Sequence, residues 1–384
     1  MPNQRLLLTG ATGIVGCEIV RELLRSPDPP EVLALLRGSD AQIEAKRRWL
    51  CEWADVSAER ALRLTAVRGD VTCPGLGMSA EDRRAALGVT GVLHSAAVTR
   101  FDQSSEEARL NNVGGTANLL EYARQCTRLE RVGIVSTAFV AGRRRGTILE
   151  EELDPDIEFN NEYERSKALA EVQVRAAMRE LPLDIYRLSI VVGRRSDGCI
   201  SRLSGIYPVF RLFHEGLLAM VPGDRDLRVD LIPSDYAAAA MLWLFAGANA
   251  PGVTYHVCAG KERSFALEEV LPAVDSGLAA SDAAWRGRGQ PVPLTVSPEV
   301  FARFASVVEL TGNRQLRQII RQTRKITQLL EVAKAFDTRA FEAAVAANPA
   351  LALPHIREWL PQIIARGVAT RWQQPPRPGG ANGA

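Results

Sequence analysis

Three glycines spaced three residues apart follow a short apolar run near the start of the chain. The run Arg5-Leu6-Leu7-Leu8 leads into Thr9-Gly10-Ala11-Thr12-Gly13-Ile14-Val15-Gly16, and an amphipathic stretch comes next. A strand, a glycine-rich turn and a helix in this order bring the free N–H groups of a helix N-terminus against an anion, as a bound dinucleotide requires. We therefore predict a phosphate loop with cofactor contacts from Thr9, Gly10, Thr12, Gly13, Ile14, Val15 and Gly16.

Short apolar runs alternate with helical patterns from residue 4 to about residue 193. The runs lie near 4–9, 31–37, 62–68, 91–95, 131–136 and 183–190, and helical patterns include 14–25, 40–53, 106–125 and 162–180. The runs are rich in Val, Ile and Leu, which is typical of strands buried on both faces. Because strands that alternate with helices form a covered parallel sheet, we predict an α/β fold with a doubly wound parallel sheet of the Rossmann type.

The rhythm changes near residue 195, and the chain becomes mainly helical after residue 262. We expect residues 1–199 plus 229–260 to form the nucleotide-binding Rossmann domain. Residues 200–228 plus 261–371 would then form a smaller, mainly helical C-terminal substrate-binding lobe. Residues 372–384 are rich in Pro and Gly and are expected to be a disordered tail.

Composition restricts the compartment and the partners. The 384 residues are 46% hydrophobic and 24% charged, with a formal net charge of +2, so bulk electrostatics favour no nucleic-acid partner. Six scattered cysteines form no Cys-x-x-Cys pair, and the four histidines lack metal-ligand spacing. No apolar run approaches the roughly 20 residues that a membrane span requires. We expect a cytoplasmic protein with reduced thiols, no metal and no integral membrane span.

The end of the second predicted strand indicates which dinucleotide fits. An acidic residue there bonds the ribose 2′-hydroxyl, whereas an arginine accommodates a 2′-phosphate. The strand ends Leu36-Arg37-Gly38, with no carboxylate before Asp40, so Arg37 favours NADPH because a guanidinium grips phosphate through two bonds. Arg47, or its neighbour Arg48, would supply a second positive contact or simply belong to a solvated helix face.

Further cofactor contacts are expected after the third and fourth predicted strands. Asp70 and Val71 are placed to meet the adenine edge, although Asp70 also suits a plain turn. Ser95, Ala96 and Ala97 are small and allow close backbone approach to the cofactor. Asn112, in the helix that follows, would hold that helix beside the site.

Tyr163 and Lys167 lie one helical turn apart on one predicted helix face. A phenol with an unperturbed pKa of about 10 is a poor proton donor or acceptor at neutral pH. Lys167 would lower that pKa by favouring the phenolate, and would also bond the nicotinamide ribose. The fifth predicted strand ends with two hydroxyls that point to opposite sides. We choose Thr137 to hold a substrate carbonyl, with Ser136 as the alternative, and predict the catalytic set Thr137, Tyr163 and Lys167.

Together these residues resemble the extended short-chain dehydrogenase/reductase superfamily over about residues 4–260, and most of all its thioester reductases and fatty acyl-CoA reductases. The similar segments are 8–13, 36–38, 69–72, 111–116, 135–140, 163–167 and 229–236. The resemblance implies NADPH, a Thr-Tyr-Lys triad and a substrate joined through a thioester to CoA or to an acyl or peptidyl carrier protein. The implied reaction is reduction of that acyl group to an aldehyde, with a second reduction to an alcohol left open. Leu188 departs from the proline of most relatives.

Two other interpretations stay open. The first is another enzyme of the same fold, either a sugar-nucleotide epimerase or dehydratase or a ketone or aldehyde reductase, although Arg37 disfavours NAD-retaining epimerases. The second is a non-catalytic NADP-sensing protein, which would be expected to lose the Tyr163 and Lys167 pair. A row of basic residues opposite an apolar stripe fits either a docking face for an acidic carrier protein or CoA phosphate, or a solvated helix face. Its members are Arg314, Arg317, Arg321, Arg324 and Lys325.

Overall fold

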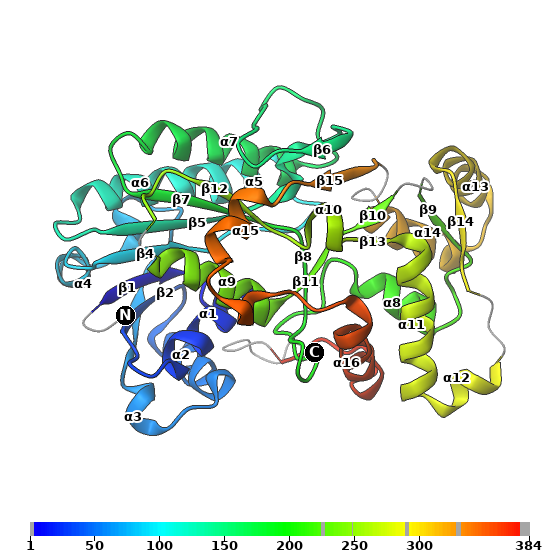
Figure 1. Cartoon of the computed structure of the whole chain (residues 1–384), viewed down its shortest axis with the longest axis horizontal. Coiled ribbons are helices and arrows are strands. Elements are labelled where there is room, and N and C mark those ends of the chain that lie inside the picture. Colours follow the sequence, from blue (N-terminus) through cyan, green and yellow to red (C-terminus); the bar gives the residue numbers. More distant parts are fainter. Residues whose placement is uncertain (1–3, 224–226, 248, 289–291, 328–331, 377–384) are drawn as a thin grey trace.

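A computed structural model describes residues 4–223, 227–247, 249–288, 292–327 and 332–376 of the chain. Its centre is a seven-stranded sheet in which every neighbouring pair runs parallel (Figure 1). From one edge to the other the strands are β12 (Thr254–Val257), β7 (Leu183–Leu188), β5 (Arg131–Thr137), β4 (Gly91–His94), β1 (Arg5–Thr9), β2 (Glu31–Leu36) and β3 (Leu64–Arg68). This order confirms the predicted doubly wound parallel sheet.

Helices cover both faces of this sheet, because consecutive apolar residues of each strand face opposite layers. Leu6 and Leu8 of β1 belong to one buried cluster, with α1 (Ile14–Arg25), α2 (Asp40–Ala54) and α9 (Ser234–Ala246). Leu7, between them, belongs to another cluster with α6 (Gly115–Gln125) and α7 (Glu162–Ala177). Figure 1 shows these two helical layers on either side of the sheet. The sheet-side helices α3 (Ala58–Ala61) and α4 (Ala80–Ala86) are shorter.

Two predicted elements differ from the structure in a way that affects the site. The predicted helix 106–125 is interrupted: α5 (Ser105–Ala108) leads into a π-helical segment, Arg109–Gly114, before α6 begins. The predicted strand 183–190 ends at Leu188, and β8 (Ile190–Val192) leaves the sheet to pair with β11 (Leu231–Pro233). π-Helical segments such as Arg109–Gly114 often occur at functional sites.

The C-terminal part is mainly helical, as predicted. Helices α8 (Tyr207–His214), α11 (Leu267–Ser281) and α16 (Ile356–Ala369) surround a third buried cluster that includes Phe210, Leu271 and Trp359. At Gly277, an added Cβ would lie 3.1 Å from Cβ of Ile364, so α11 and α16 approach closely. The remaining elements of this side are α10 (Gly260–Arg263), α12 (Ala283–Arg288), α13 (Pro298–Leu310), α14 (Arg314–Thr327), β9 (Met220–Pro222), β10 (Arg228–Val229), β13 (Phe265–Ala266) and β14 (Leu294–Val296).

Part of the segment 261–371 packs against the sheet side rather than against the lobe. β15 (Lys334–Phe336) pairs with β6 (Gly146–Ile148), and α15 (Arg339–Val345) contributes Phe341 to the cluster beneath β1. The carboxylate of Glu150 anchors this return by accepting the backbone N–H groups of Ala340 at 2.6 Å and Phe341 at 3.1 Å. The domain boundaries given above therefore stay a prediction.

The tail predicted to be disordered from residue 372 begins with ordered contacts. Trp372 is only 6% exposed, and Gln374 bonds the backbone of Leu203. The prediction is therefore wrong for these first residues, because a buried indole fixes the chain. Residues 377–384 lie outside the described part of the chain.

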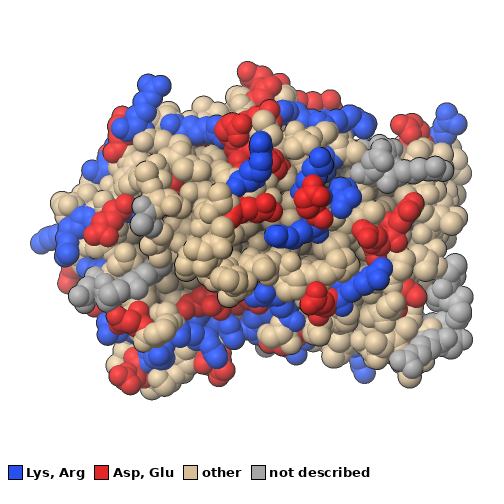
Figure 2. Space-filling model, in the orientation of Figure 1, with Lys and Arg blue, Asp and Glu red and all other residues tan. Residues whose placement is uncertain are grey.

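Acidic and basic side chains intermingle over the face that Figure 2 shows. Within the described ranges, no helix is both long enough and apolar enough to cross a membrane. The same ranges contain no group of three or more His, Cys, Asp or Glu side chains that could hold a metal ion.

Candidate active site

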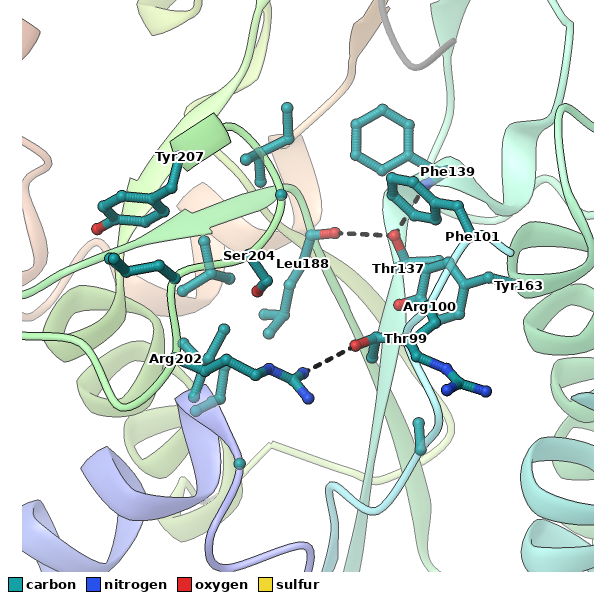
Figure 3. Close-up of a pocket in the computed structure, with 18 of the residues that line it drawn as sticks. Thr99, Arg100, Phe101, Thr137, Phe139, Tyr163, Leu188, Arg202, Ser204 and Tyr207 are labelled. Atoms are coloured by element: carbon teal, nitrogen blue, oxygen red, sulfur yellow. Dashed lines mark hydrogen bonds between the residues drawn. The ribbon is translucent and has the colours of Figure 1, made fainter. Parts of the chain in front are cut away.

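A cavity of about 640 Å³ lies where β1, β4, β5 and β7 end. One wall comes from the sheet: Gly13, Ile14 and Val15 after β1, Ser95 and Ala97 after β4, Val135, Ser136 and Thr137 at the end of β5, Leu188 at the end of β7, and Tyr163 and Lys167 from α7. The facing wall comes from residues 202–211, Trp372 and Gln374. In doubly wound sheets, ligands bind at this edge, where the strand order reverses beside the first strand. Figure 3 shows Arg202 and Tyr207 across the cavity from Thr137 and Tyr163.

The glycine loop packs so tightly that side chains have no room. Gly10 has a φ of +72°, and a Cβ there would lie 2.5 Å from the backbone N of Ala96. A Cβ on Gly16 would lie 2.1 Å from the carbonyl O of Gly10. Gly13 precedes α1, and none of the described side chains caps the first turn of that helix. Its N–H groups are therefore available to an anion, and the loop fits the pyrophosphate of a dinucleotide.

The side chain of Thr9 supports local structure, so its contact with a cofactor stays a prediction. Its side chain is fully buried, lies 2.8 Å from Nδ1 of His94, and accepts the N–H of Ala96 at 3.3 Å. Burial and the nearby Lys167 lower the pKa of His94 to about 3, so this imidazole is neutral. Thr9 therefore holds the loop after β4 in place rather than facing the cavity.

Positive groups gather where β2 ends. Arg37 pairs with Asp70, at 3.7 Å between Nη1 and Oδ2, and Nζ of Lys46 donates to the carbonyl O of Arg37 at 2.7 Å. Lys46 was missed because its place in α2 shows no pattern that links it to Arg37. Arg47 instead pairs with Glu44 on its own helix at 3.0 Å, as a solvated helix face would predict. Arg37 and Lys46 are the better-placed cations for a 2′-phosphate.

Asp70 and Val71 also support local structure. The carboxylate of Asp70 accepts the N–H and the hydroxyl of Thr72, at 2.9 and 2.8 Å, which is the turn-forming alternative. The carbonyl O of Val71 accepts Nδ2 of Asn118 at 2.8 Å, which joins this turn to α6. Neither residue lines the cavity, so contacts to an adenine stay a prediction.

The two hydroxyls at the end of β5 face different partners. Ser136 donates to Oε1 of Glu171 at 2.5 Å, in a buried network with Arg187. The hydroxyl of Thr137 donates to the carbonyl O of Leu188 at 3.4 Å and accepts the N–H of Phe139 at 3.3 Å (Figure 3). Thr137 also acts on the neighbouring Tyr163 phenol, because it opposes the rise in the pKa of that phenol. The geometry therefore favours Thr137 over Ser136 as the partner of a substrate oxygen.

Tyr163 is protonated at neutral pH. Burial raises the pKa of its phenol to about 12; the hydrogen bond with Thr137 opposes this rise and the charge of Glu164 adds to it. The ring of Phe101 lies 6.1 Å from the Tyr163 ring, centroid to centroid, and both rings line the cavity. The phenol is thus placed to donate a proton rather than to accept one.

Lys167 lies on the same face of α7 but does not act on the phenol as predicted. Its Nζ donates to the carbonyl O of Val135 at 2.8 Å. Burial lowers the pKa of Lys167 to about 8, against the opposing charge of Glu171. The prediction that Lys167 lowers the pKa of Tyr163 is wrong for this structure, because the ammonium is directed to the end of β5.

Asn112 lies in the π-helical segment and joins three elements. Its Oδ1 accepts the N–H of Val98 at 2.9 Å, and its Nδ2 donates to the carbonyl O of Val98 at 3.1 Å and to the hydroxyl of Ser166 at 2.8 Å. Ser166 directly precedes Lys167 in α7. Asn112 therefore positions the loop after β4 relative to α7, in keeping with the predicted holding role.

A buried ion pair behind the site was also missed. Arg187 is fully buried and bonds Glu171 through Nε at 3.0 Å and Nη2 at 2.7 Å. Its Nη1 and Nη2 also donate to the carbonyl O atoms of Glu150 and Glu152. The only sequence signal is that Glu171 stands four residues after Lys167 on α7. A charged residue in a buried strand is rare unless it is paired.

The basic row on α14 is partly neutralised. Arg314, Arg317 and Arg321 line a shallow hollow with Gln318, and Arg321 bonds Glu309 of α13 at 3.1 Å. The side chain of Lys325 lies outside the described part of the chain. The docking face and the solvated face therefore stay alternatives.

Comparison with known proteins identifies the family. A family model described as male sterility protein, an NAD-binding domain, matches residues 8–241. The chain therefore belongs to the male sterility protein family of the extended short-chain dehydrogenase/reductases, which confirms the resemblance seen in the sequence.

Individual relatives agree with this assignment. Fatty acyl-CoA reductase wat of Drosophila melanogaster is 30% identical over 276 residues, which cover 62% of this chain and 53% of that protein. The chain thus spans about half the length of this relative. The terminal R domain of the myxalamid PKS-NRPS pathway has a TM-score of 0.78 at 23% identity and covers 98% of this chain and 93% of its own. The reductase domain of a nonribosomal peptide synthetase from Mycobacterium tuberculosis has a TM-score of 0.68 at 25% identity, and the match covers 97% of this chain and 93% of that domain. The shared fold therefore includes the lobe.

Proposed function

We propose that the chain reduces a thioester-linked acyl group with NADPH, through Thr137, Tyr163 and Lys167. The observation that carries the proposal is the pair of hydroxyls, from Thr137 and Tyr163, on the wall of a cavity that also contains the glycine loop. The relatives support it, since they are named as a fatty acyl-CoA reductase and as reductase domains of peptide and polyketide assembly lines.

The sheet side holds the cofactor in this proposal. The N-terminus of α1 and the turn Gly10–Gly16 bind the pyrophosphate, and Arg37 with Lys46 binds the 2′-phosphate. Ser95 and Ala97 form the small-residue floor after β4. When bound, NADPH supplies a hydride to the acyl carbon.

The chain's own groups manage the oxygen and the proton. Thr137 Oγ1 and the Tyr163 hydroxyl donate to the thioester carbonyl oxygen, which stabilises the negative charge that develops there. The Tyr163 phenol, protonated because its pKa is about 12, then gives its proton to that oxygen. Lys167 orients the cofactor ribose, and its ammonium is held at the end of β5 by the carbonyl O of Val135. Collapse of the resulting hemithioacetal releases the thiol of CoA or of a carrier protein and leaves an aldehyde.

The test is NADPH consumption with acyl-CoAs and acyl-loaded carrier proteins, with product analysis to separate aldehyde from alcohol. Tyr163→Phe removes the proton donor and should lower kcat by roughly 10²- to 10⁴-fold. Tyr255→Phe makes the same chemical change on β12, away from the cavity lining, and should leave kcat unchanged.

The other interpretations predict different results. Turnover of a ketone, an aldehyde or a sugar nucleotide, but of no thioester, would point to another enzyme of this fold. NADPH binding without any turnover would support a sensor. Full activity in Tyr163→Phe would refute the role of the phenol.

A further inference from the structure

The chain reverses sharply after α16, at a strained turn. Arg371 and Trp372 have φ angles of 52° and 54°, in the left-handed region that side-chain-bearing residues rarely adopt. The N–H of Arg371 bonds the carbonyl O of Val368 at 3.0 Å, and that of Trp372 bonds Gly367 at 2.8 Å. Strain of this kind persists only where the surrounding structure enforces it, and it often marks a functional segment. We call residues 371–374 the strap.

Trp372 is fixed at this turn by contacts from distant elements. Its indole Nε1 donates to Nδ1 of His214 at 2.9 Å, and Nε2 of His214 lies 2.9 Å from Asp282. The ring packs against Gly367, where an added Cβ would come within 2.3 Å of it. His214, at the end of α8, therefore binds the indole, and Gly367 leaves room for the ring beside α16.

Gln374 joins the strap to the loop that precedes α8. Its Oε1 accepts the N–H of Leu203 at 3.0 Å, and its Nε2 donates to the carbonyl O of Leu203 at 2.6 Å. One side chain thus binds both backbone groups of one residue, as a neighbouring strand would. The preceding Arg202 reaches across to Thr99 on the sheet side, at 3.1 Å (Figure 3). The cavity is lined by all four residues of these contacts, Gln374, Leu203, Arg202 and Thr99.

We propose that Trp372 and Gln374, the two residues of the strap that line the cavity, form the end wall of its acyl-binding part, and that Trp372 sets the longest acyl chain that the site accepts. The inference rests on the proposed function, because an acyl group must reach Thr137 and Tyr163 on the opposite wall. Leu203, Tyr207 and Pro208 line the same cavity as Trp372 and supply the apolar surface that a hydrocarbon chain requires. Gln374 keeps the loop that carries Leu203 closed on this wall.

The experiment compares kcat/KM across saturated acyl-CoAs of increasing even chain length. Trp372→Ala opens the wall, so its optimum should move to longer chains, with about a tenfold gain for the longer substrate relative to the wild-type optimum. Trp372→Phe keeps part of the ring and should give a smaller shift in the same direction. Gln374→Ala frees the loop and should broaden the profile. Gln373→Ala changes the exposed residue between them, which does not line the cavity, and should leave the profile unchanged.

Equilibrium binding separates this proposal from the proposed function. The fluorescent fatty acid cis-parinaric acid is displaced by free fatty acids of increasing length, in wild type and in each variant. If the wild type reduces no thioester, the proposed function fails. The same shift toward longer fatty acids in Trp372→Ala would still support the role of Trp372 in limiting chain length. A profile of unchanged shape in folded Trp372→Ala and Trp372→Phe overturns the proposal, as does an equal loss at every chain length. Should Trp372→Ala not fold, Trp372→Phe decides alone.

Discussion

The two walls of the cavity are built in different ways. The sheet wall includes small residues, such as Gly13, Ser95 and Ala97, that follow the ends of parallel strands. The lobe wall consists of large side chains, among them Arg202, Tyr207 and Trp372, brought together from distant parts of the sequence. Under the proposed function, the two walls have different tasks: the sheet wall would fix where the cofactor lies, and the large side chains of the lobe wall would shape the room for the substrate.

This contrast has a mechanical consequence. On the sheet wall, a Cβ on Gly10 or Gly16 would strike backbone atoms, which cannot move without shifting a strand. On the lobe wall, Gln374 and Trp372 hold their partners through side-chain bonds that span 171 and 158 residues. Changes of side chain there alter the cavity without displacing Thr137 or Tyr163. We therefore expect the sheet wall to tolerate substitution far less well than the lobe.

The largest effect is expected for Gly16→Ala. The new methyl group would lie 2.1 Å from the carbonyl O and 2.8 Å from the carbonyl C of Gly10, so the loop itself must shift. We expect the free energy of unfolding to fall by about 3 kcal/mol, as for overpacking in a closed site. Because the phosphate loop moves, NADPH affinity should also be lost. Urea unfolding and a fluorescence titration with NADPH measure the two effects.

Gly312→Ala is the matched control on the lobe side. Nothing lies within 4 Å of a Cβ at Gly312, and its backbone lies outside the left-handed region. Its free energy of unfolding should stay within about 0.5 kcal/mol of wild type. Wild-type NADPH affinity in Gly16→Ala would show that the sheet wall is as adaptable as the lobe.

The same contrast explains what the sequence could predict. The glycine spacing and the apolar runs are local patterns, and they led to the sheet and to the site at its edge. The alternation of side chains along β5 predicted that Ser136 and Thr137 point to opposite sides, and the choice of Thr137 stays a prediction. These features depend on residues close together in the chain or on the regular geometry of strands.

Long-range contacts account for what the sequence missed. The bond from Lys167 to Val135 joins residues 32 apart and redirects the ammonium from the phenol. The buried pair of Arg187 and Glu171 depends on how α7 lies over β7. Trp372 looked like the start of a disordered tail because nothing near it in the chain indicates that His214 receives it. Such pairings follow from packing and carry no local signature.

Lys167 should make activity depend on pH in a definite direction. Its pKa is lowered to about 8 by burial, so the ammonium is charged below that pH and loses its proton as the pH rises through it. If the charge supports the reaction, kcat/KM should fall about tenfold for each pH unit above 8. The phenol of Tyr163, with a pKa of about 12, stays protonated across this range and cannot cause the fall. A pH profile from about 6 to 10 measures it.

Lys167→Arg tests the assignment of that titration. A guanidinium keeps its charge throughout the range, so whatever activity the variant retains should not fall above pH 8. A fall with the wild-type midpoint would assign the titration to another group. In that case the reaction would depend on the main chain and the hydroxyls of the sheet wall and would not require a positive charge on Lys167.

The smallest effect is expected for Arg37→Ala, at the outer end of the sheet wall. Arg37 and Lys46 are the two side chains that we assign to the cofactor's 2′-phosphate. The Arg37 side chain is 63% exposed and lies beside Asp70. Solvent screening limits such a contact, so the preference for NADPH over NADH should fall only about fivefold. Arg47→Ala should change it less, because Glu44 already holds that guanidinium at 3.0 Å. Steady-state kcat/KM with each dinucleotide gives the ratio. Equal losses in both variants would mean that charge on α2, rather than the contact at the end of β2, selects the cofactor.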